Sequence, residues 1–386
     1  MMKPKSKGKK KPYAKVRLAY CEEALFDALP LARKLEKGEY ALVAGNRTGY
    51  FPLALFKAFP EAEVRFHAFD KYHAHSIRKK FLDEEIEPDS MILCSPSVLP
   101  EDRDPSKPLY SLAFFMMSPR TTSAELTLDQ LEDIHESLIE GGEFFAAFEG
   151  DGDDALKMLK KVWTSVNVIS RNKHVSLFKM KKQSPLTERR DFSASWKASV
   201  PGGEEMEFVS FPGCFCHRRA DMGGLALAEI ASTIVKKDAV VLDMGCGSGL
   251  VGILIADAQR RMGNSSPKTI FIDSHARAIA AAKLNAQKAG IYDGATFLLR
   301  DDGIPRGEVE IADMFVGNPP YYSDYRIAEV FLETAYRALR PGGICLTVVK
   351  TASGLQSVQE KYFQTVEVIN RRGYCVLKSV KKGTRK

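Results

Sequence analysis

The chain has 386 residues, of which 45% are hydrophobic and 27% are charged. That balance is typical of folded globular proteins and excludes a disordered or fibrous chain. The length is sufficient for two domains, each with a hydrophobic core of its own. No run of about eighteen apolar residues occurs, and the N-terminus is rich in lysine, so we expect a cytoplasmic protein without membrane spans.

The formal net charge of +7 is concentrated at the two ends of the chain. Residues 1–18 and 381–386 are predicted to form basic tails. Such tails suit a phosphate-rich partner, because neutralised phosphates release counterions and strengthen binding. A solvated tail that only aids solubility explains the same composition, and charge alone leaves both interpretations open.

Seven scattered cysteines favour reduced thiols over a disulfide framework. The cluster Cys214-Phe215-Cys216-His217 is the one hint of a metal site. A zinc site would need a second ligand pair at suitable spacing, and the sequence offers none. We therefore expect structural thiols and no metal.

In chain order, strands and helices alternate in the first half. An apolar strand at residues 40–45 leads into a small-residue turn and a helix at 51–59. A strand ending in an acid follows at 64–70, then another helix, and a further strand at 112–117. A helix that ends at Gly141-Gly142 precedes the last predicted strand, 144–148.

The second half repeats this order, with strands near 240–243, 269–273, 295–299, 313–316 and 344–349. Alternation of this kind predicts doubly wound, mostly parallel α/β sheets, and here an internal duplication. Both halves are expected to cap a helix with a glycine pair, Gly141-Gly142 and Gly342-Gly343. We predict domains at 19–185 and 204–380, joined by a polar linker at 186–203.

A glycine-rich turn follows the strand that ends near Asp243. The turn Gly245-Cys246-Gly247-Ser248-Gly249 opens a helix that begins near Val251, so a ligand can approach the backbone at the strand's carboxyl end. The glycine spacing also fits the G-x-G-x-x-G pattern of a dinucleotide site, which is a weak signal alone. The acid ahead of the glycines favours another cofactor. It resembles motif I of S-adenosylmethionine-dependent methyltransferases, in which a carboxylate holds the positively charged methionine part.

Acids after the next two strands complete the expected cofactor site. Asp273 ends the strand 269–273, where it can accept hydrogen bonds from ribose hydroxyls of either cofactor. After the strand 295–299, Asp301 or Asp302 is suited to bond the adenine amino group or to be a solvated turn residue, and we favour Asp301. The predicted cofactor-binding residues are Asp243, Gly245, Cys246, Gly247, Gly249, Asp273, Ser274, Asp301 and Asn318.

Asn318-Pro319-Pro320-Tyr321 directly follows the strand at 313–316. It resembles the tetrapeptide of N-methyltransferases, in which the Asn oxygen and the next carbonyl accept the hydrogens of a planar amine while the aromatic ring stacks on it. Asn318, Pro319 and Tyr321 are therefore the predicted catalytic residues, and positioning is the main catalytic effect. An ordinary turn with an exposed Tyr is the alternative. No thiol nucleophile is expected, and an acidic aminium product needs no dedicated base.

Together these motifs resemble the bacterial ribosomal RNA guanine-N2-methyltransferases of the small-subunit type. Residues 211–215 (Phe-Pro-Gly-Cys-Phe) and Asp221-Met222-Gly223 resemble the family's segment before motif I. The resemblance implies two tandem Rossmann-like class I methyltransferase domains, S-adenosylmethionine as cofactor, ribosomal RNA or the small subunit as partner, and a monomer. In the family that segment closes over cofactor and substrate, which makes Phe215 and Asp221 substrate-binding candidates. A core Phe and a helix N-cap Asp are the alternatives.

Tyr322, just after the tetrapeptide, is a third candidate for substrate binding, by base stacking, although an aromatic residue there can also simply pack the loop.

The first half resembles the family's altered N-terminal copy. It has Ala44 where a cofactor-binding acid would stand, and Met116-Met117-Ser118-Pro119 where the tetrapeptide would stand. We therefore expect a non-catalytic domain that supports the fold or helps to hold RNA. Two alternatives remain open for the whole chain: an N-methyltransferase of release-factor glutamine or of adenine, and a non-catalytic RNA-binding assembly factor.

Overall fold

The computed structural model describes residues 19–45, 48–98, 110–117, 123–320 and 326–383. The basic tail at 1–18 and the last three residues, 384–386, lie outside these ranges. The chain packs as two units. The first comprises Met1–Ala68 and His73–Arg190, and the second comprises Phe69–Tyr72 and Asp191–Lys386.

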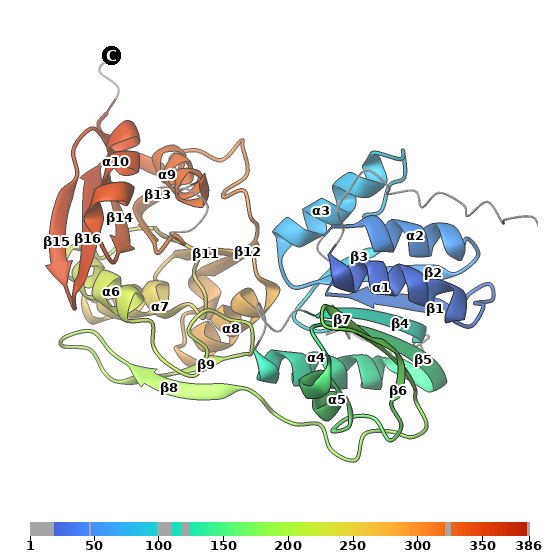
Figure 1. Ribbon diagram of the computed structural model, residues 1–386. Coiled ribbons are helices and arrows are strands. Elements are labelled where there is room, and N and C mark those ends of the chain that lie inside the picture. The colour runs from blue at the N-terminus through green and yellow to red at the C-terminus, as the bar shows by residue number, and fades with distance from the viewer. Residues whose placement is uncertain (1–18, 46–47, 99–109, 118–122, 321–325, 384–386) are drawn as a thin grey trace, which may run out of the picture. The chain divides into compact units, whose positions relative to one another are not determined.

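The first unit is built on a seven-stranded sheet of order β3-β2-β1-β4-β5-β7-β6. Its helices are α1 (Tyr20–Ala28), the short 3-10 helix η1 (Leu29–Leu31), α2 (Tyr50–Ala58), α3 (Lys71–Leu82), α4 (Ala124–Ser137) and α5 (Asp153–Leu159). Its strands are β1 (Tyr40–Ala44), β2 (Glu63–Ala68), β3 (Ile92–Cys94), β4 (Tyr110–Met117), β5 (Leu138–Glu149), β6 (Asn167–Arg171) and β7 (Val175–Lys181). Only the pairs β5–β7 and β6–β7 are antiparallel (Figure 1).

The second unit repeats this topology with the order β12-β11-β10-β13-β14-β16-β15. Its helices are α6 (Met222–Ile234), α7 (Leu250–Arg261), α8 (Ala276–Lys288), the 3-10 helix η2 (Tyr292–Gly294), α9 (Arg326–Ala338) and α10 (Ala352–Phe363). Its sheet strands are β10 (Val241–Met244), β11 (Thr269–Asp273), β12 (Ala295–Leu299), β13 (Ala312–Gly317), β14 (Leu339–Val349), β15 (Glu367–Arg371) and β16 (Tyr374–Val380). The expected pair of doubly wound, mostly parallel sheets is confirmed.

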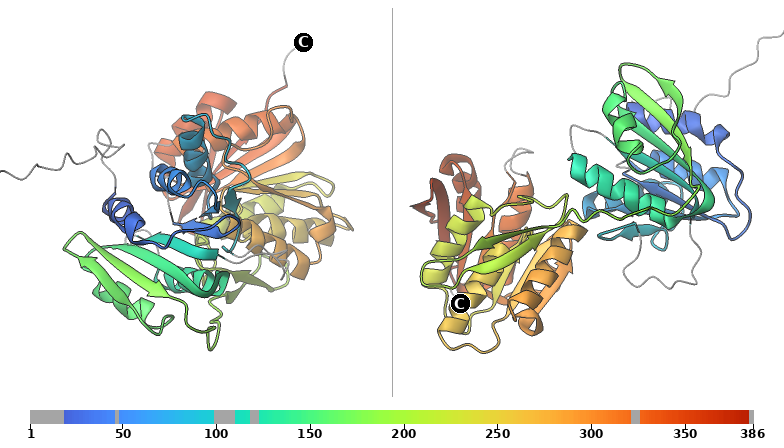
Figure 2. Two further views of the ribbon diagram at one scale, coloured as in Figure 1. Left: turned by 90° about the vertical axis from the view of Figure 1, so that its right-hand side faces the viewer. Right: turned by 90° about the horizontal axis from the view of Figure 1, so that it is seen from below.

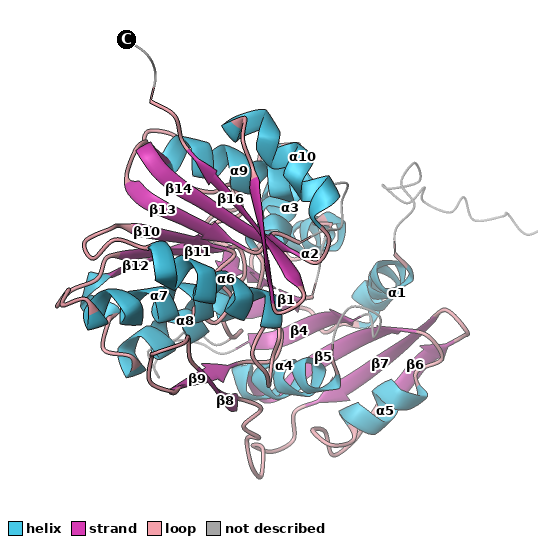
Figure 3. Ribbon diagram, turned by 90° about the vertical axis from the view of Figure 1, so that its left-hand side faces the viewer, coloured by secondary structure: helices cyan, strands magenta, loops and turns pink. Residues whose placement is uncertain are grey.

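Helices cover both faces of the second sheet, which explains why its central strands are continuously apolar. One core cluster joins the sheet to α6, α7 and α8, and another joins the opposite face to α9 and α10 (Figure 3). All residues of β10 are buried. Figure 2 shows the same layering of helices around a sheet from two further directions. The loops at the carboxyl ends of β10, β11 and β13 therefore rest on a rigid, fully packed base.

The predicted glycine-pair helix caps are wrong in both halves. Helix α4 ends at Ser137 and α9 at Ala338, and the following residues are already extended and belong to β5 and β14. Gly141 and Gly342 lie within these strands, with φ of +80° and +81°. The glycines thus supply the left-handed geometry that the pattern predicted, but they use it to kink a strand and not to end a helix.

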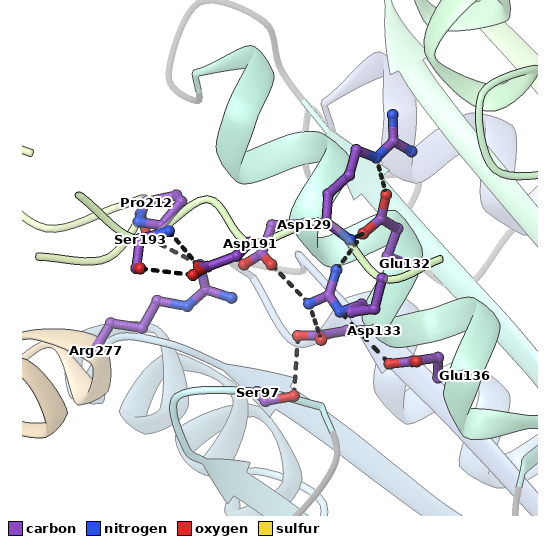
Figure 4. A network of polar contacts seen from close by, with 11 residues as sticks. Ser97, Asp129, Glu132, Asp133, Glu136, Asp191, Ser193, Pro212 and Arg277 are labelled. Atoms are coloured by element: carbon purple, nitrogen blue, oxygen red, sulfur yellow. Dashed lines mark hydrogen bonds and ion pairs between the residues drawn. The ribbon is translucent and has the colours of Figure 1, made fainter. Parts of the chain in front are cut away.

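Residues of the predicted linker are ordered against the rest of the chain. Arg189 forms ion pairs with Asp129 (2.6 Å), Glu132 (2.7 Å) and Asp133 (2.5 Å) of α4, and Arg190 also pairs with Glu132 (Figure 4). Further on, β8 (Ala194–Ala198) pairs with β9 (Met206–Ser210). The segment between the two sheets is therefore partly regular structure.

All seven cysteines are free thiols. Among the residues that the structure describes, no group of His, Cys, Asp and Glu has the arrangement of a metal site. No helix in the described part of the chain has the length and apolar character needed to cross a bilayer.

Candidate active site

Asp243 is a buried carboxylate at the carboxyl end of β10. It is 2% exposed, and its Oδ2 accepts a hydrogen bond of 2.8 Å from the backbone N–H of Gly252 in α7. Burial raises the pKa of Asp243 to about 7, partly offset by the Gly252 bond and reinforced by the nearby charge of Asp273. A cationic group next to Asp243 would favour its ionised form.

The glycine loop after Asp243 is held open by backbone hydrogen bonds. The N–H groups of Gly245 and Cys246 both donate to the carbonyl of Ile272, at 2.8 and 3.0 Å. Gly247 has φ of +54°, and a Cβ built on it would meet no atom within 4 Å. Gly249, with φ of +83°, is the N-cap of α7. The loop thus leaves its backbone uncovered at Gly247, as a ligand that approaches the main chain requires.

Asp273 closes the other side of this loop. Its Oδ2 accepts from the Gly247 N–H and its Oδ1 from the His275 N–H, both at 2.9 Å. Burial raises the pKa of Asp273 to about 6, against the lowering effect of these backbone donors. The neighbouring Ser274 begins the connection to α8. Asp243 and Asp273 therefore place two buried carboxylates around one glycine loop.

The two acids after β12 differ in their surroundings. Asp302 is exposed and forms an ion pair with Arg300, with Oδ1 at 2.7 Å from Nη2. Asp301 is partly buried. The structure therefore engages Asp302 locally, and it leaves Asp301 as the better-sheltered of the two predicted candidates.

Asn318 directly follows β13, beside the Asp243 loop, because Asp243 lies opposite Val316 and Met244 opposite Gly317. The Asn318 Nδ2 donates to Asp221 Oδ2 at 2.7 Å. Since its nitrogen is committed to Asp221, the amide's other atom, Oδ1, is presented as an acceptor on the opposite side of the amide plane. Pro319 continues from Asn318, whereas Tyr321 and Tyr322 lie outside the described residues.

Asp221 is at once a helix cap and a partner of the predicted catalytic amide. Its Oδ1 accepts from Gly223 N–H at 3.0 Å and its Oδ2 from Gly224 N–H at 2.9 Å, which caps the N-terminus of α6. The N-cap interpretation of Asp221 is therefore confirmed, and the contact with Asn318 adds a role that the sequence gave no means to see. Two segments almost a hundred residues apart meet at this carboxylate.

The segment before Asp221 is a tight loop with an exposed aromatic tip. The Pro212 carbonyl accepts from Arg277 Nη1 at 2.9 Å, which ties the loop to α8 (Figure 4). Gly213, Cys216 and Arg218 all have positive φ. Phe215 is 71% exposed, so the alternative that it is a core residue is wrong. The strained backbone turns Phe215 toward solvent, where it is available to a ligand.

The corresponding loop of the first unit is built differently. Strand β1 ends at Ala44, and a Cβ on Gly45 would lie 2.1 Å from the carbonyl oxygen of Met116 in β4. Helix α2 receives its buried acid from α1 instead, where Glu22 Oε1 accepts from the Phe51 N–H at 3.0 Å. The strand end in this unit thus carries no carboxylate for a cofactor.

Comparisons with known proteins agree with this picture of the second unit. The model of the methyltransferase small domain matches residues 205–378. Residues 205–378 belong to the methyltransferase small domain family. Asp243, Gly245, Asp273 and Asn318 all lie within this methyltransferase small domain.

Related proteins extend the likeness to the first unit. The ribosomal RNA small subunit methyltransferase C of Pseudomonas paraeruginosa is 30% identical over 211 residues, which are 53% of this chain and 60% of that protein. The protein of the same name from Vibrio vulnificus is 22% identical over 86% of this chain and 91% of its own length. The first-mentioned alignment thus spans about 60% of the length of the curated relative.

One solved structure has the same two-unit fold. It is the T. thermophilus 16S rRNA N2 G1207 methyltransferase, determined in complex with AdoMet and guanosine. It superposes with a TM-score of 0.70 and 18% identity over 93% of this chain and 92% of that chain. The methyltransferase small domain and its N-terminal companion therefore share a fold with that protein.

Proposed function

We propose that this chain transfers the methyl group of S-adenosylmethionine to the exocyclic N2 amine of a guanine in ribosomal RNA. The observation that carries the proposal is the fixed amide of Asn318, which lies at the carboxyl end of β13 beside the Asp243 loop and is oriented by Asp221 at 2.7 Å. The relatives' names and the guanosine in the T. thermophilus complex support this choice of substrate.

The residues around the glycine loop fit S-adenosylmethionine. Asp243 and Asp273 are buried carboxylates whose raised pKa values a cationic ligand would lower. The uncovered backbone at Gly247 leaves room for a ligand to approach. We assign cofactor binding to Asp243, Gly245, Cys246, Gly247, Gly249, Asp273, Ser274, Asp301 and Asn318. The cofactor supplies an electrophilic methyl group.

The chain's own contribution to the reaction is orientation. The Asn318 Oδ1 and the Pro319 carbonyl accept the two hydrogens of the guanine amine, which directs its lone pair toward the methyl group. The new N–C bond forms as the S–C bond breaks, and the aminium product releases its proton to water. We assign stacking on the base to Tyr321 and further substrate contacts to Phe215, Asp221 and Tyr322.

We further propose a division of labour between the two halves. Residues 204–380 form the catalytic domain, and residues 19–185 form a non-catalytic domain, because β1 ends without a carboxylate and Met116 packs its carbonyl against Gly45. The basic tails at 1–18 and 381–386 give the chain a positive surplus that suits a ribosomal RNA partner.

The proposal is tested by transfer of labelled methyl from S-adenosylmethionine to unmodified ribosomal RNA, assembled small subunits and release factor. We expect label in RNA or in small subunits, and its loss in the Asn318→Ala variant with cofactor binding retained. Label in release factor or in adenine would move the substrate to another planar amine. No transfer together with no cofactor binding would support the assembly-factor alternative.

A further inference from the structure

A basic and aromatic surface borders the Asn318 site on the side of the last two strands. Lys350 follows the end of β14, and Tyr374 begins the antiparallel partner β16, because Val349 lies opposite Cys375. The Lys350 Nζ lies 4.3 Å from the centre of the Tyr374 ring. Lys350 is exposed, and no ion pair of Lys350 is found among the described residues. Its charge is therefore held in a defined place by an aromatic ring.

Two arginines extend this surface at the β15–β16 turn (Figure 1). Arg371 and Arg372 both pair with Glu229 of α6, and Arg372 does so at 2.6 Å. Glu229 is only 3% exposed, whereas the arginine side chains are 44% and 39% exposed. Burial opposes ionisation of Glu229, but the two arginines outweigh it and lower its pKa. A buried carboxylate thus anchors two guanidinium groups whose remaining N–H donors face solvent.

We call Lys350, Arg371, Arg372 and Tyr374 the hairpin patch. It carries three positive charges, of which Glu229 neutralises one. The turn that presents it is tight, with φ of +53° at Arg372 and +72° at Gly373, as in two-residue hairpins. The positive surplus is therefore fixed on rigid elements and not on long flexible side chains alone.

The hairpin patch lies beside the predicted catalytic amide. A Cβ built on Gly223 would be 3.2 Å from Tyr374 Cε1 and 3.5 Å from Asn318 Nδ2, so ring and amide flank the same glycine. Strands β13 and β14 are parallel, with Gly317 opposite Thr347. Asn318 and Lys350 consequently both lie just beyond the carboxyl ends of adjacent strands. A nucleotide held by Asn318 has its flanking phosphates within reach of this surface.

We propose that the hairpin patch binds the sugar–phosphate backbone of the RNA next to the target guanine, an inference that rests on the proposed function for the identity of the substrate. Guanidinium groups match phosphate oxygens in geometry, and an ammonium group adds a point charge. Backbone contacts of this kind hold the register of the RNA while Asn318 selects the amine.

The test compares the Lys350→Gln variant with Lys237→Gln, a matched control. Lys237 is also an exposed lysine, but it lies at the opposite, amino edge of the sheet, just before β10. We expect Lys350→Gln to raise the Kd for a ribosomal RNA fragment about 3- to 10-fold and to reduce the slope of log Kd against log salt by about 0.7 to 0.9, the loss of one phosphate contact. S-adenosylmethionine affinity and kcat at saturating RNA should stay unchanged.

A second variant, Arg372→Gln, keeps Arg371 as a partner for Glu229, and we expect it to act in the same direction. Equal Kd values and salt slopes for Lys350→Gln, Lys237→Gln and the unmodified chain would overturn the proposal. An equal loss of binding to polyglutamate would identify an acidic protein as the partner and overturn it too. RNA binding that depends on Lys350 without any methyl transfer would support the hairpin patch and contradict the proposed function, so the two failures are distinguishable.

Discussion

The contact between Asp221 and Asn318 leads to a prediction that separates positioning from stability. Replacing Asp221 by Ala removes the two α6 cap bonds and the 2.7 Å bond from Asn318. Loss of the cap should lower the free energy of unfolding by about 1 kcal/mol. Loss of a hydrogen bond to a charged acceptor, worth about 1.5 to 3 kcal/mol, should lower kcat/KM about 10- to 100-fold if it is realised in the transition state.

The Asp221→Ser variant separates the two effects. A serine hydroxyl is a good N-cap, but its single oxygen cannot replace both carboxylate oxygens that bond Gly223, Gly224 and Asn318. We expect the free energy of unfolding, measured with urea, to stay within about 0.5 kcal/mol of the unmodified chain. The kcat for methyl transfer should still fall as it does in Asp221→Ala, with little change in cofactor affinity.

A matched control comes from the first unit. Ser123 caps α4 by accepting from the Leu126 N–H at 3.1 Å, so Ser123→Ala removes a cap far from Asn318 in sequence. It should cost about 1 kcal/mol of stability and leave kcat unchanged. The reasoning is refuted if Asp221→Ser retains full kcat, or if Ser123→Ala lowers kcat as much as Asp221→Ala does.

Three further predictions concern charge and packing. Because burial raises the pKa of Asp243 to about 7, protonation below that pH should weaken S-adenosylmethionine binding, with Kd rising up to tenfold per pH unit in titration calorimetry and levelling off above pH 7. Gly245→Ala should destabilise more than Gly342→Ala in urea unfolding: both have positive φ, costing about 1 kcal/mol, but only the first meets Phe331, at 2.8 Å. Arg189→Ala should cost about 2 to 3 kcal/mol of first-unit stability by protease resistance, since buried carboxylates lose a partner.

Much of the fold is predictable because its central strands obey simple local rules. The apolar strands that carry the site are buried on both faces, so they stand out as continuous hydrophobic runs, and β11 and β12 match the predicted ranges. The final hairpin of each unit was not predicted. In β6 and β15 nearly every residue is exposed, so neither shows the apolar alternation that marks a strand.

The helix caps show where local chemistry was ambiguous. A glycine pair after a helical pattern predicts a C-cap, yet positive φ at Gly141 and Gly342 serves equally well to kink a strand. Which use is made depends on pairing with a neighbouring strand, and Tyr110 opposite Leu138 decides it in the first unit. A sequence window does not contain that partner.

The site was predictable in part for the same reason. Motif I and the tetrapeptide are contiguous, so Asp243 and Asn318 stand out along the chain. The link from Asp221 to Asn318, and the approach of Tyr374 to Gly223, join segments that are about 97 and 151 residues apart. Only the folded sheet, which brings strand ends and α6 together, shows these contacts.

The most direct test of the account is nucleoside mass analysis of ribosomal RNA after reaction with S-adenosylmethionine, with the unmodified chain and the Asn318→Ala variant in parallel. The account predicts N2-methylguanosine with the unmodified chain and its loss in the variant, although the variant still binds the cofactor. N2-methylguanosine formed equally well by Asn318→Ala, or no modified guanosine from a chain that binds the cofactor and the RNA, would contradict it.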